Sequence, residues 1–131
     1  MATRAEDRYS QAGRDLAHAR HSRACGDYEW ACFAAQQAAE KALKAVYQQQ
    51  QAEAWGHSVL GLLQNLPAVP QPGPGLMDLA KELDKHYIPA RYPNSYPQGA
   101  PHQYYTEAEA DRAIGQAERI IEFCKGFLPG R

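Results

Sequence analysis

The sequence predicts an all-α fold of about five helices, three of them long or medium in length and two forming a short pair. Apolar residues recur at the three- and four-residue steps of helices, and no segment alternates apolar and polar residues as a half-buried strand does. Clusters of proline and glycine separate the helical segments. With 131 residues, of which 44% are apolar, the chain is predicted to form a single domain over residues 1–131 around one core.

Residues 3–25 are predicted to form the first helix. Its apolar positions step by four, three, four and three residues and make a narrow stripe of Ala5, Tyr9, Ala12, Leu16 and Ala19. Gly26 can adopt the left-handed backbone that ends a helix, and the Asp27 side chain is expected to accept hydrogen bonds from the free N–H groups of the next helix. Two antiparallel helices are therefore expected to meet at this turn.

The second helix is predicted from Tyr28 to about Gln51, at the centre of a helical bundle. One apolar seam consists of Cys32, Ala35, Ala39, Ala42 and Val46. A second stripe beside it consists of Trp30, Phe33, Ala34, Ala38, Lys41 and Ala45. A helix that is apolar around so much of its circumference packs among several neighbours, and its alanines let those neighbours approach closely.

A short helix pair follows. His57 or Ser58 is expected to begin a third helix that Pro67 stops, and residues 67–75, with four prolines and two glycines, are expected to form a loop that includes a turn at residues 73–75. Helical spacing returns over residues 76–87, and Pro89 is expected to end this fourth helix.

A loop rich in proline and tyrosine precedes the last helix. Residues 88–105 contain four prolines and four of the eight tyrosines of the chain, so this loop is too aromatic for a simple spacer. Residues 106–109 (TEAE) match a capping box, in which a threonine and a glutamate satisfy each other's backbone N–H groups. A long apolar-faced helix is therefore expected to begin here.

Charge and cysteine content limit the classes of function. The 14 basic and 15 acidic residues give a net charge of −1, so a histone-like or ribosomal protein is excluded. Three cysteines without a CxxC motif predict reduced thiols in a cytoplasmic protein. The N-terminus does not resemble a secretory signal, and no window approaches about 18 consecutive apolar residues, so no membrane association is expected.

No catalytic or metal-binding motif is found in the sequence. His18, His21 and Cys25 would share one face of the first helix, but a fourth zinc ligand is missing and several arginines lie nearby, which favours a solvated polar face. HExxH, GxSxG and phosphate-binding glycine motifs are absent from the sequence. We therefore predict no catalytic residue, no metal and no cofactor.

Five residues are candidates for binding a ligand. Lys41 and Lys44 could hold phosphates, or their stems could cover apolar surface while the ammonium groups stay in water. Arg91 and Tyr92 could hold a phosphate and stack on a base, or Arg91 could bond to a carboxylate such as that of Glu40 or cap a helix C-terminus, with Tyr92 packed over the bundle. His57 could orient a loop or face the ligand.

Several segments in order resemble the HEPN domain family, over roughly residues 9–127. They are residues 26–45 (GDYEWACFAAQQAAEKALKA), residues 56–58 (GHS) before a leucine-rich helix, residues 90–93 (ARYP), and residues 105–106 (YT) before the last helix. The resemblance implies an up-and-down helical bundle with a short helix pair, usually dimeric. Some relatives are metal-independent ribonucleases that act as toxins beside a minimal nucleotidyltransferase antitoxin, whereas others bind nucleotides or mediate association.

The ribonuclease relatives carry an arginine, four to six residues and then a histidine near the start of the last core helix. Here ten residues separate Arg91 from His102, and no histidine follows Arg112. We therefore expect a homodimeric binding module for a nucleotide or phosphate ligand, with a nucleotidyltransferase partner in a toxin–antitoxin-like context. A ribonuclease toxin, which would act on RNA, and a purely structural dimerisation domain are the alternatives.

Overall fold

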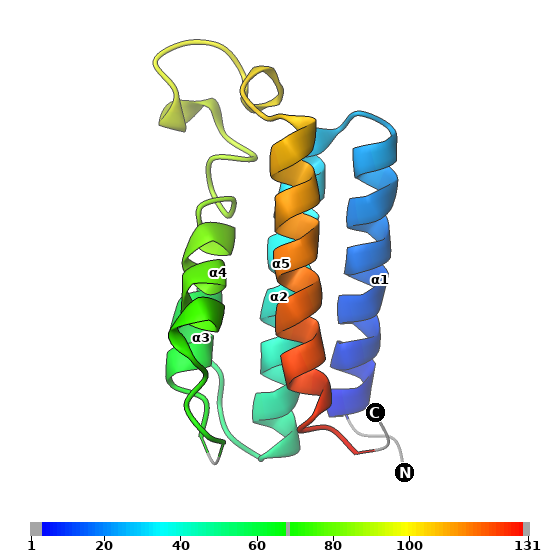
Figure 1. Ribbon diagram of the computed structural model, residues 1–131, viewed down its shortest axis with the longest axis vertical. Helices are drawn as coiled ribbons and strands as arrows, with labels where there is room; N and C mark the ends of the chain where they lie inside the picture. The colour runs from blue at the N-terminus through cyan, green and yellow to red at the C-terminus, as the bar shows by residue number, and fades with distance from the viewer. Residues whose placement is uncertain (1–3, 68, 130–131) are drawn as a thin grey trace.

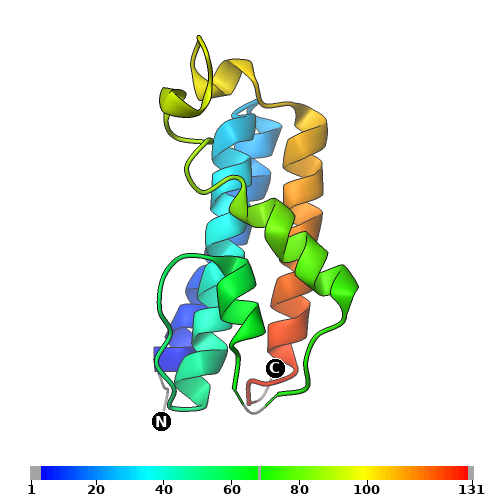
Figure 2. The ribbon, with the colours of Figure 1, turned by 90° about the vertical axis from the view of Figure 1, so that its left-hand side faces the viewer.

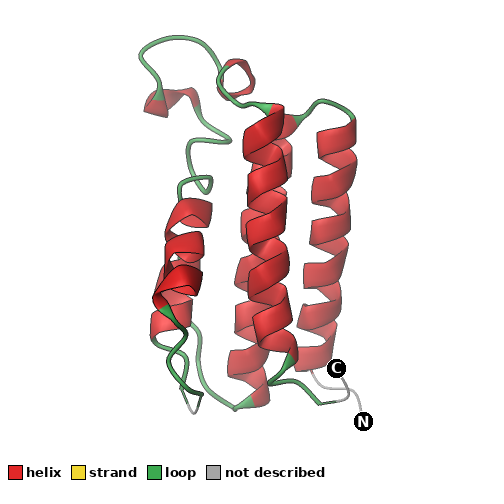
Figure 3. Cartoon of the chain, viewed as in Figure 1, coloured by secondary structure: helices red, strands yellow, loops and turns green. Residues whose placement is uncertain are grey.

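Three long helices run along the long axis of the molecule in the computed structural model, which describes residues 4–67 and 69–129 (Figure 1). They are α1 (Arg4–Ala24), α2 (Tyr28–Gln49) and α5 (Glu107–Lys125). The shorter helices α3 (Val59–Gln64) and α4 (Pro74–Asp84) lie together on one side, and the loop between α4 and α5 contains the short 3₁₀ turns η1 (Pro93–Ser95) and η2 (Pro101–Gln103). The described residues form no strand (Figure 3), so the all-α prediction is confirmed.

α2 is the central helix, as its sequence predicts. It packs against α1, α5, α3 and α4, and its fully buried alanines are Ala31, Ala35, Ala38, Ala39, Ala42 and Ala45. Such short side chains allow the long helices to approach closely over their whole length. Leu43 and Val46 add the larger fully buried side chains of this helix.

At the turn between α1 and α2, the predicted backbone conformation is confirmed but the predicted side-chain cap is not. Gly26 has a φ of +84°, the left-handed conformation that glycine adopts without strain. Asp27 is the N-cap residue of α2, but its side chain makes no capping hydrogen bond, so that expectation is wrong. The Asp27 carbonyl instead accepts from the Ala31 N–H, which is the ordinary first bond of the helix. Thr3, which the sequence assigns to the first helix, lies outside the described residues.

The boundaries of the short helix pair differ from the expected ones at several places. Ser58 is the N-cap of α3, and its hydroxyl accepts from the Gly61 N–H at 3.0 Å. α3 ends at Gln64, before Pro67. α4 begins at Pro74, not after a turn at residues 73–75, because proline fits the first helical position where no N–H partner is needed. α4 also ends at Asp84, well before Pro89.

α4 crosses the bundle obliquely beside α5, while α3 lies against α2 (Figure 2). The carboxyl end of α4 thereby meets the amino end of α3. Asp84 accepts hydrogen bonds there from the Val59 N–H at 2.7 Å, the Leu60 N–H at 3.1 Å and the Ser58 hydroxyl at 2.8 Å. One carboxylate therefore caps a helix that is distant in sequence.

The capping box at the start of α5 is confirmed. The Glu109 N–H donates to the Thr106 hydroxyl at 3.1 Å, and the Thr106 N–H donates to a Glu109 carboxylate oxygen at 3.2 Å. The two residues thus satisfy each other's free backbone donors.

Replacing Thr106 by alanine is expected to lower the free energy of unfolding by ~1 kcal/mol, because the Glu109 N–H loses its acceptor. Urea denaturation followed by circular dichroism measures this change. Ser10→Ala on the exposed face of α1 is the control and should change stability by less than ~0.5 kcal/mol. An equal effect of both substitutions would contradict the capping role of Thr106.

Candidate functional site

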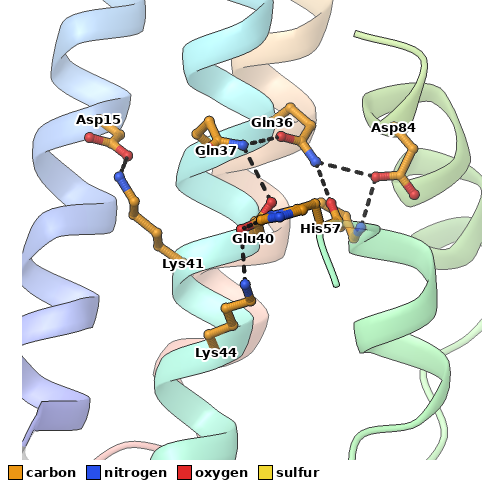
Figure 4. A network of polar contacts seen from close by, with 9 residues as sticks. Asp15, Gln36, Gln37, Glu40, Lys41, Lys44, His57 and Asp84 are labelled. Carbon is orange, nitrogen blue, oxygen red and sulfur yellow. Dashed lines mark hydrogen bonds and ion pairs between the residues drawn. The ribbon is translucent and has the colours of Figure 1, made fainter. Parts of the chain in front are cut away.

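Glu40 is a buried carboxylate halfway along α2, and its side chain is only 6% exposed. Its Oε2 atom accepts a hydrogen bond from Lys44 Nζ at 3.1 Å and lies 3.2 Å from His57 Nδ1, while Gln37 Nε2 donates to Oε1 at 3.3 Å (Figure 4). A buried charge requires such partners, because its desolvation is costly. Glu40 therefore brings together two of the predicted ligand residues, Lys44 and His57.

Arg91 lies in a cluster of aromatic rings beyond the end of α4. Its Cζ atom is 4.4 Å from the ring centre of Phe33, 4.8 Å from that of Tyr87 and 5.1 Å from that of Tyr92. Arg91 Nε donates to the Tyr87 carbonyl at 2.9 Å. Tyr87 lies three residues beyond the end of α4, so Arg91 does not cap that helix, and the ion pair with Glu40 is not formed either. Within the described part of the chain, the two Nη atoms of Arg91 make no hydrogen bond or ion pair.

His57 and Arg91 both contact the ring of Tyr87. The His57 imidazole stacks on this ring with centres 5.1 Å apart and an interplanar angle of 15°. The His57 side chain is 58% exposed, so it can reach a ligand as well as Glu40. The series Lys44, Glu40, His57, Tyr87 and Arg91 is therefore a continuous chain of contacts from α2 to the loop.

Lys41 and Lys44 line a groove between α1 and α2. The groove has a volume of about 360 Å³ and is lined by Arg4, Asp7, Arg8, Gln11, Glu40, Lys41 and Lys44. Four cations face two carboxylates in this lining, and Asp15 pairs with Lys41 from beside it, which leaves an excess of one positive charge. Lys41 Nζ also bonds to Asp15 at 2.5 Å, and Arg8 makes no ion pair within the residues that the structure describes.

The sequence left open whether Tyr92 packs over the bundle or faces a ligand. The residue is 48% exposed, so it is not covered by packing on the bundle. Lys41 also borders a smaller hollow that Phe33 helps to line, and the Phe33 ring in turn contacts Arg91. The five predicted ligand residues thus fall into two neighbouring groups. Lys41 and Lys44 lie in the α1–α2 groove, whereas His57 and Arg91 share the Tyr87 ring and Tyr92 contacts Arg91.

The cysteines do not form an evident reactive or metal-binding group. Burial raises the pKa of the Cys32 thiol to about 12 and also raises the pKa of Cys124, so both thiols are protonated at neutral pH. Cys25 Sγ lies 3.7 Å from His21 Nε2 on an exposed face. Among the described residues, no three histidine, cysteine or acidic side chains gather as they would around a metal ion.

The family model of the HEPN domain matches residues 5–127, almost the whole chain. The chain belongs to the HEPN domain family. No curated protein matches this HEPN domain significantly.

Three solved structures resemble this HEPN domain along nearly their full length. TT1696 from Thermus thermophilus is 46% identical, covers 97% of this chain and 100% of its own, and superposes with a TM-score of 0.94. ST0689, described as an archaeal HEPN homologue, is 45% identical. It covers 95% of this chain and 98% of its own, with a TM-score of 0.80. The HEPN domain protein TM0613 from Thermotoga maritima is 42% identical. It covers 95% of this chain and 99% of its own, with a TM-score of 0.75.

Two residues of this HEPN site are missed by reasoning from the sequence. From the sequence, Tyr87 is only one of the helically spaced residues of the fourth helix, and Glu40 is only a carboxylate to which Arg91 could bond. The i, i+4 spacing of Glu40 and Lys44 predicts their ion pair, so this signal is present. Nothing in the local sequence indicates that His57 and Arg91 share one tyrosine ring, because 33 residues separate them along the chain.

No helix among the described residues is both long and apolar enough to span a bilayer.

Proposed function

We propose that this HEPN domain is a binding module for a phosphate-bearing ligand of the nucleotide class and that it associates with a minimal nucleotidyltransferase. The observation that carries the ligand proposal is the Arg91 guanidinium, held between aromatic rings with both Nη atoms free of protein partners among the described residues. An arginine oriented in this way can donate two parallel hydrogen bonds to a phosphate. The half-exposed Tyr92 ring beside it offers a surface on which a base can stack.

The α1–α2 groove supports the same proposal. Its excess of positive charge attracts further phosphate groups, and Lys44 is already oriented by Glu40. His57 connects this groove to the Arg91 cluster through Glu40 on one side and Tyr87 on the other. A nucleotide with its base on Tyr92 and its phosphates toward Arg91 would lie over these residues.

ATP or GTP is expected to raise the melting temperature of the protein, because a ligand that binds only the folded state stabilises it. At a tenfold excess over Kd the stabilisation is about 1.4 kcal/mol, or roughly 5 °C. Arg91→Lys should reduce the shift, since an ammonium group cannot make the planar two-pronged contact, and Tyr92→Ala should reduce it through lost stacking. Differential scanning fluorimetry at millimolar nucleotide measures the shift.

Arg119→Lys on the exposed face of α5 is the matched control and should keep the full shift. Circular dichroism must show that each variant is folded. If neither nucleotide shifts the melting temperature of the wild-type protein, nucleotide binding is wrong and association remains as the function.

The common contact of His57 and Arg91 with Tyr87 favours a second candidate, a metal-independent ribonuclease. In such an enzyme the histidine transfers a proton and the arginine stabilises the charge of the transition state. The unmatched spacing of Arg91 and His102 argues against it, so purified protein is expected to leave single-stranded RNA intact. Cleavage that is abolished by His57→Ala or His102→Ala would establish the ribonuclease instead.

The protein is expected to sediment as a homodimer at micromolar concentration. Trp30 is 48% exposed near the start of α2 and packs edge-on against Phe33. An exposed aromatic surface of this kind is typical of a protein–protein contact, and two-fold dimers are the commonest assembly. Trp30→Ala should weaken the dimer at least tenfold, whereas Trp55→Ala, at a side chain that is 80% exposed elsewhere, should not. Sedimentation as an ideal monomer at ~100 μM would refute the homodimer.

The proposed association with a minimal nucleotidyltransferase is tested by coexpression. Failure of the two proteins to sediment together would refute this association.

A further inference from the structure

A separate hollow lies between the tyrosine-rich loop, the carboxyl end of α4 and the amino-terminal half of α5. Its volume is about 460 Å³. Aromatic rings line it from the loop and from the turn after α4, and charged side chains line it from both helices. These residues are Glu82, Lys85, His86, Tyr96, Tyr104, Tyr105, Glu109, Arg112, Ala113 and Gln116, and none of them lines the α1–α2 groove.

Gln116 gives the hollow an unused amide. The residue is only 5% exposed, yet its side chain forms no hydrogen bond with any part of the chain that the structure describes. The residue lines the hollow, and its amide atoms are not completely buried. Buried amides are nearly always hydrogen-bonded, so a donor and an acceptor facing an open hollow indicate a polar partner there.

The aromatic side chains make a flat and largely uncharged wall. Tyr96 and Tyr104 stack with ring centres 4.2 Å apart and an interplanar angle of 10°. His86 Nδ1 and the Tyr105 hydroxyl are 3.1 Å apart and satisfy each other. Burial lowers the pKa of His86 and raises the pKa of Tyr105, although Glu109 and Glu82 oppose the change at His86, so both groups are neutral at pH 7.

The charges around the hollow cancel. Lys85 and Arg112 face Glu82 and Glu109, and Glu109 is already engaged in the capping box with Thr106. The hollow therefore lacks the excess of positive charge that a polyphosphate requires and that the α1–α2 groove has. A neutral ligand with a flat ring suits it better.

We propose that this hollow is a separate binding site for an uncharged planar heterocycle of the nucleobase class. Gln116 would pair through its donor and acceptor with an adjacent acceptor and donor on the edge of the ring, as a glutamine amide pairs with adenine. The tyrosine rings would contact the faces of the heterocycle. This site does not depend on the phosphate-binding proposal, because it shares none of that proposal's residues.

Titration of the full chain with free adenine, followed by ligand-observed NMR, tests the site. Adenine is expected to bind, and phenol, a flat ring that lacks the paired donor and acceptor, is expected to bind at least tenfold more weakly. Gln116→Leu should weaken adenine binding by about tenfold or more, because it removes both hydrogen bonds while keeping the side-chain volume similar. Gln48→Leu, in a different hollow, should bind adenine as the wild type does.

If Gln116→Leu does not fold, Tyr104→Leu replaces it, because Tyr104 is 40% exposed and its loss leaves the core intact. Tyr104→Leu should also weaken adenine binding at least several-fold. The proposal is overturned if adenine fails to bind at millimolar concentration, if phenol binds equally well, or if the folded variants bind adenine like the wild type. Loss of adenine binding in Tyr92→Ala would place adenine at the nucleotide site instead and would also overturn it.

Discussion

Replacing Asp84 by alanine is expected to lower the free energy of unfolding by about 3 kcal/mol. Its carboxylate accepts hydrogen bonds from the Val59 and Leu60 N–H groups and from the Ser58 hydroxyl, and Gln36 Nε2 approaches it at 3.4 Å. Hydrogen bonds to a charged group are stronger than neutral ones, and the two N–H groups are partly buried. Urea unfolding monitored by circular dichroism measures the loss.

Asp78→Ala is the matched control on the same helix. The Asp78 carboxylate is 70% exposed and pairs only with Lys81 at 3.5 Å among the described residues, so its removal should change stability by less than ~0.5 kcal/mol. Asp84→Asn should recover part of the loss, because the amide oxygen still accepts one or two of the bonds. If Asp84→Ala and Asp78→Ala have equal effects, the carboxylate does not hold α3 and α4 together.

Replacing Glu40 by glutamine is expected to cost about 3 kcal/mol of stability, because the change leaves the Lys44 ammonium without its charged partner. The Lys44 side chain is only 14% exposed, so water compensates poorly for the lost carboxylate. Thermal and urea unfolding measure this loss. The double variant Glu40→Gln with Lys44→Met removes both charges and should recover much of the stability.

Glu118→Gln is the control for the effect of removing a carboxylate from an ion pair. Glu118 pairs with Arg20 at 2.7 Å, but both side chains are about half exposed, so the loss should stay below ~1 kcal/mol. A loss from Glu40→Gln that is no larger than that from Glu118→Gln would show that Glu40 is not a buried structural charge. In that case the ordered position of His57 would need another explanation.

These two carboxylates show how the fold prepares the candidate site. Asp84 holds the amino end of α3, and the residue that precedes its N-cap is His57. Glu40 then fixes the His57 ring from the side of α2. A change at either carboxylate is therefore expected to move His57 even though neither side chain belongs to the predicted ligand residues.

Much of the helical architecture was predictable because it depends on short-range chemistry. Glycine at position 26 adopts the left-handed turn, and the threonine and glutamate of the last helix close their capping box within one turn. The alanine-rich face of α2 predicts a central helix, because burial on several sides is the only way to remove that surface from water. The predicted start of α4 was wrong, because proline, which often lies just after a helix, is equally suited to the first position of the next one.

Periodicity, caps and motif order are local properties of the chain, so they were enough to predict the number of helices, their order and the family. Tertiary structure alone decided which side chains meet. It placed His57 and Arg91 on one tyrosine ring, placed Gln116 in the wall of a hollow and set Asp84 against a helix 25 residues earlier. Such contacts depend on how helices cross and on which charges become buried, and no short stretch of sequence encodes either quantity.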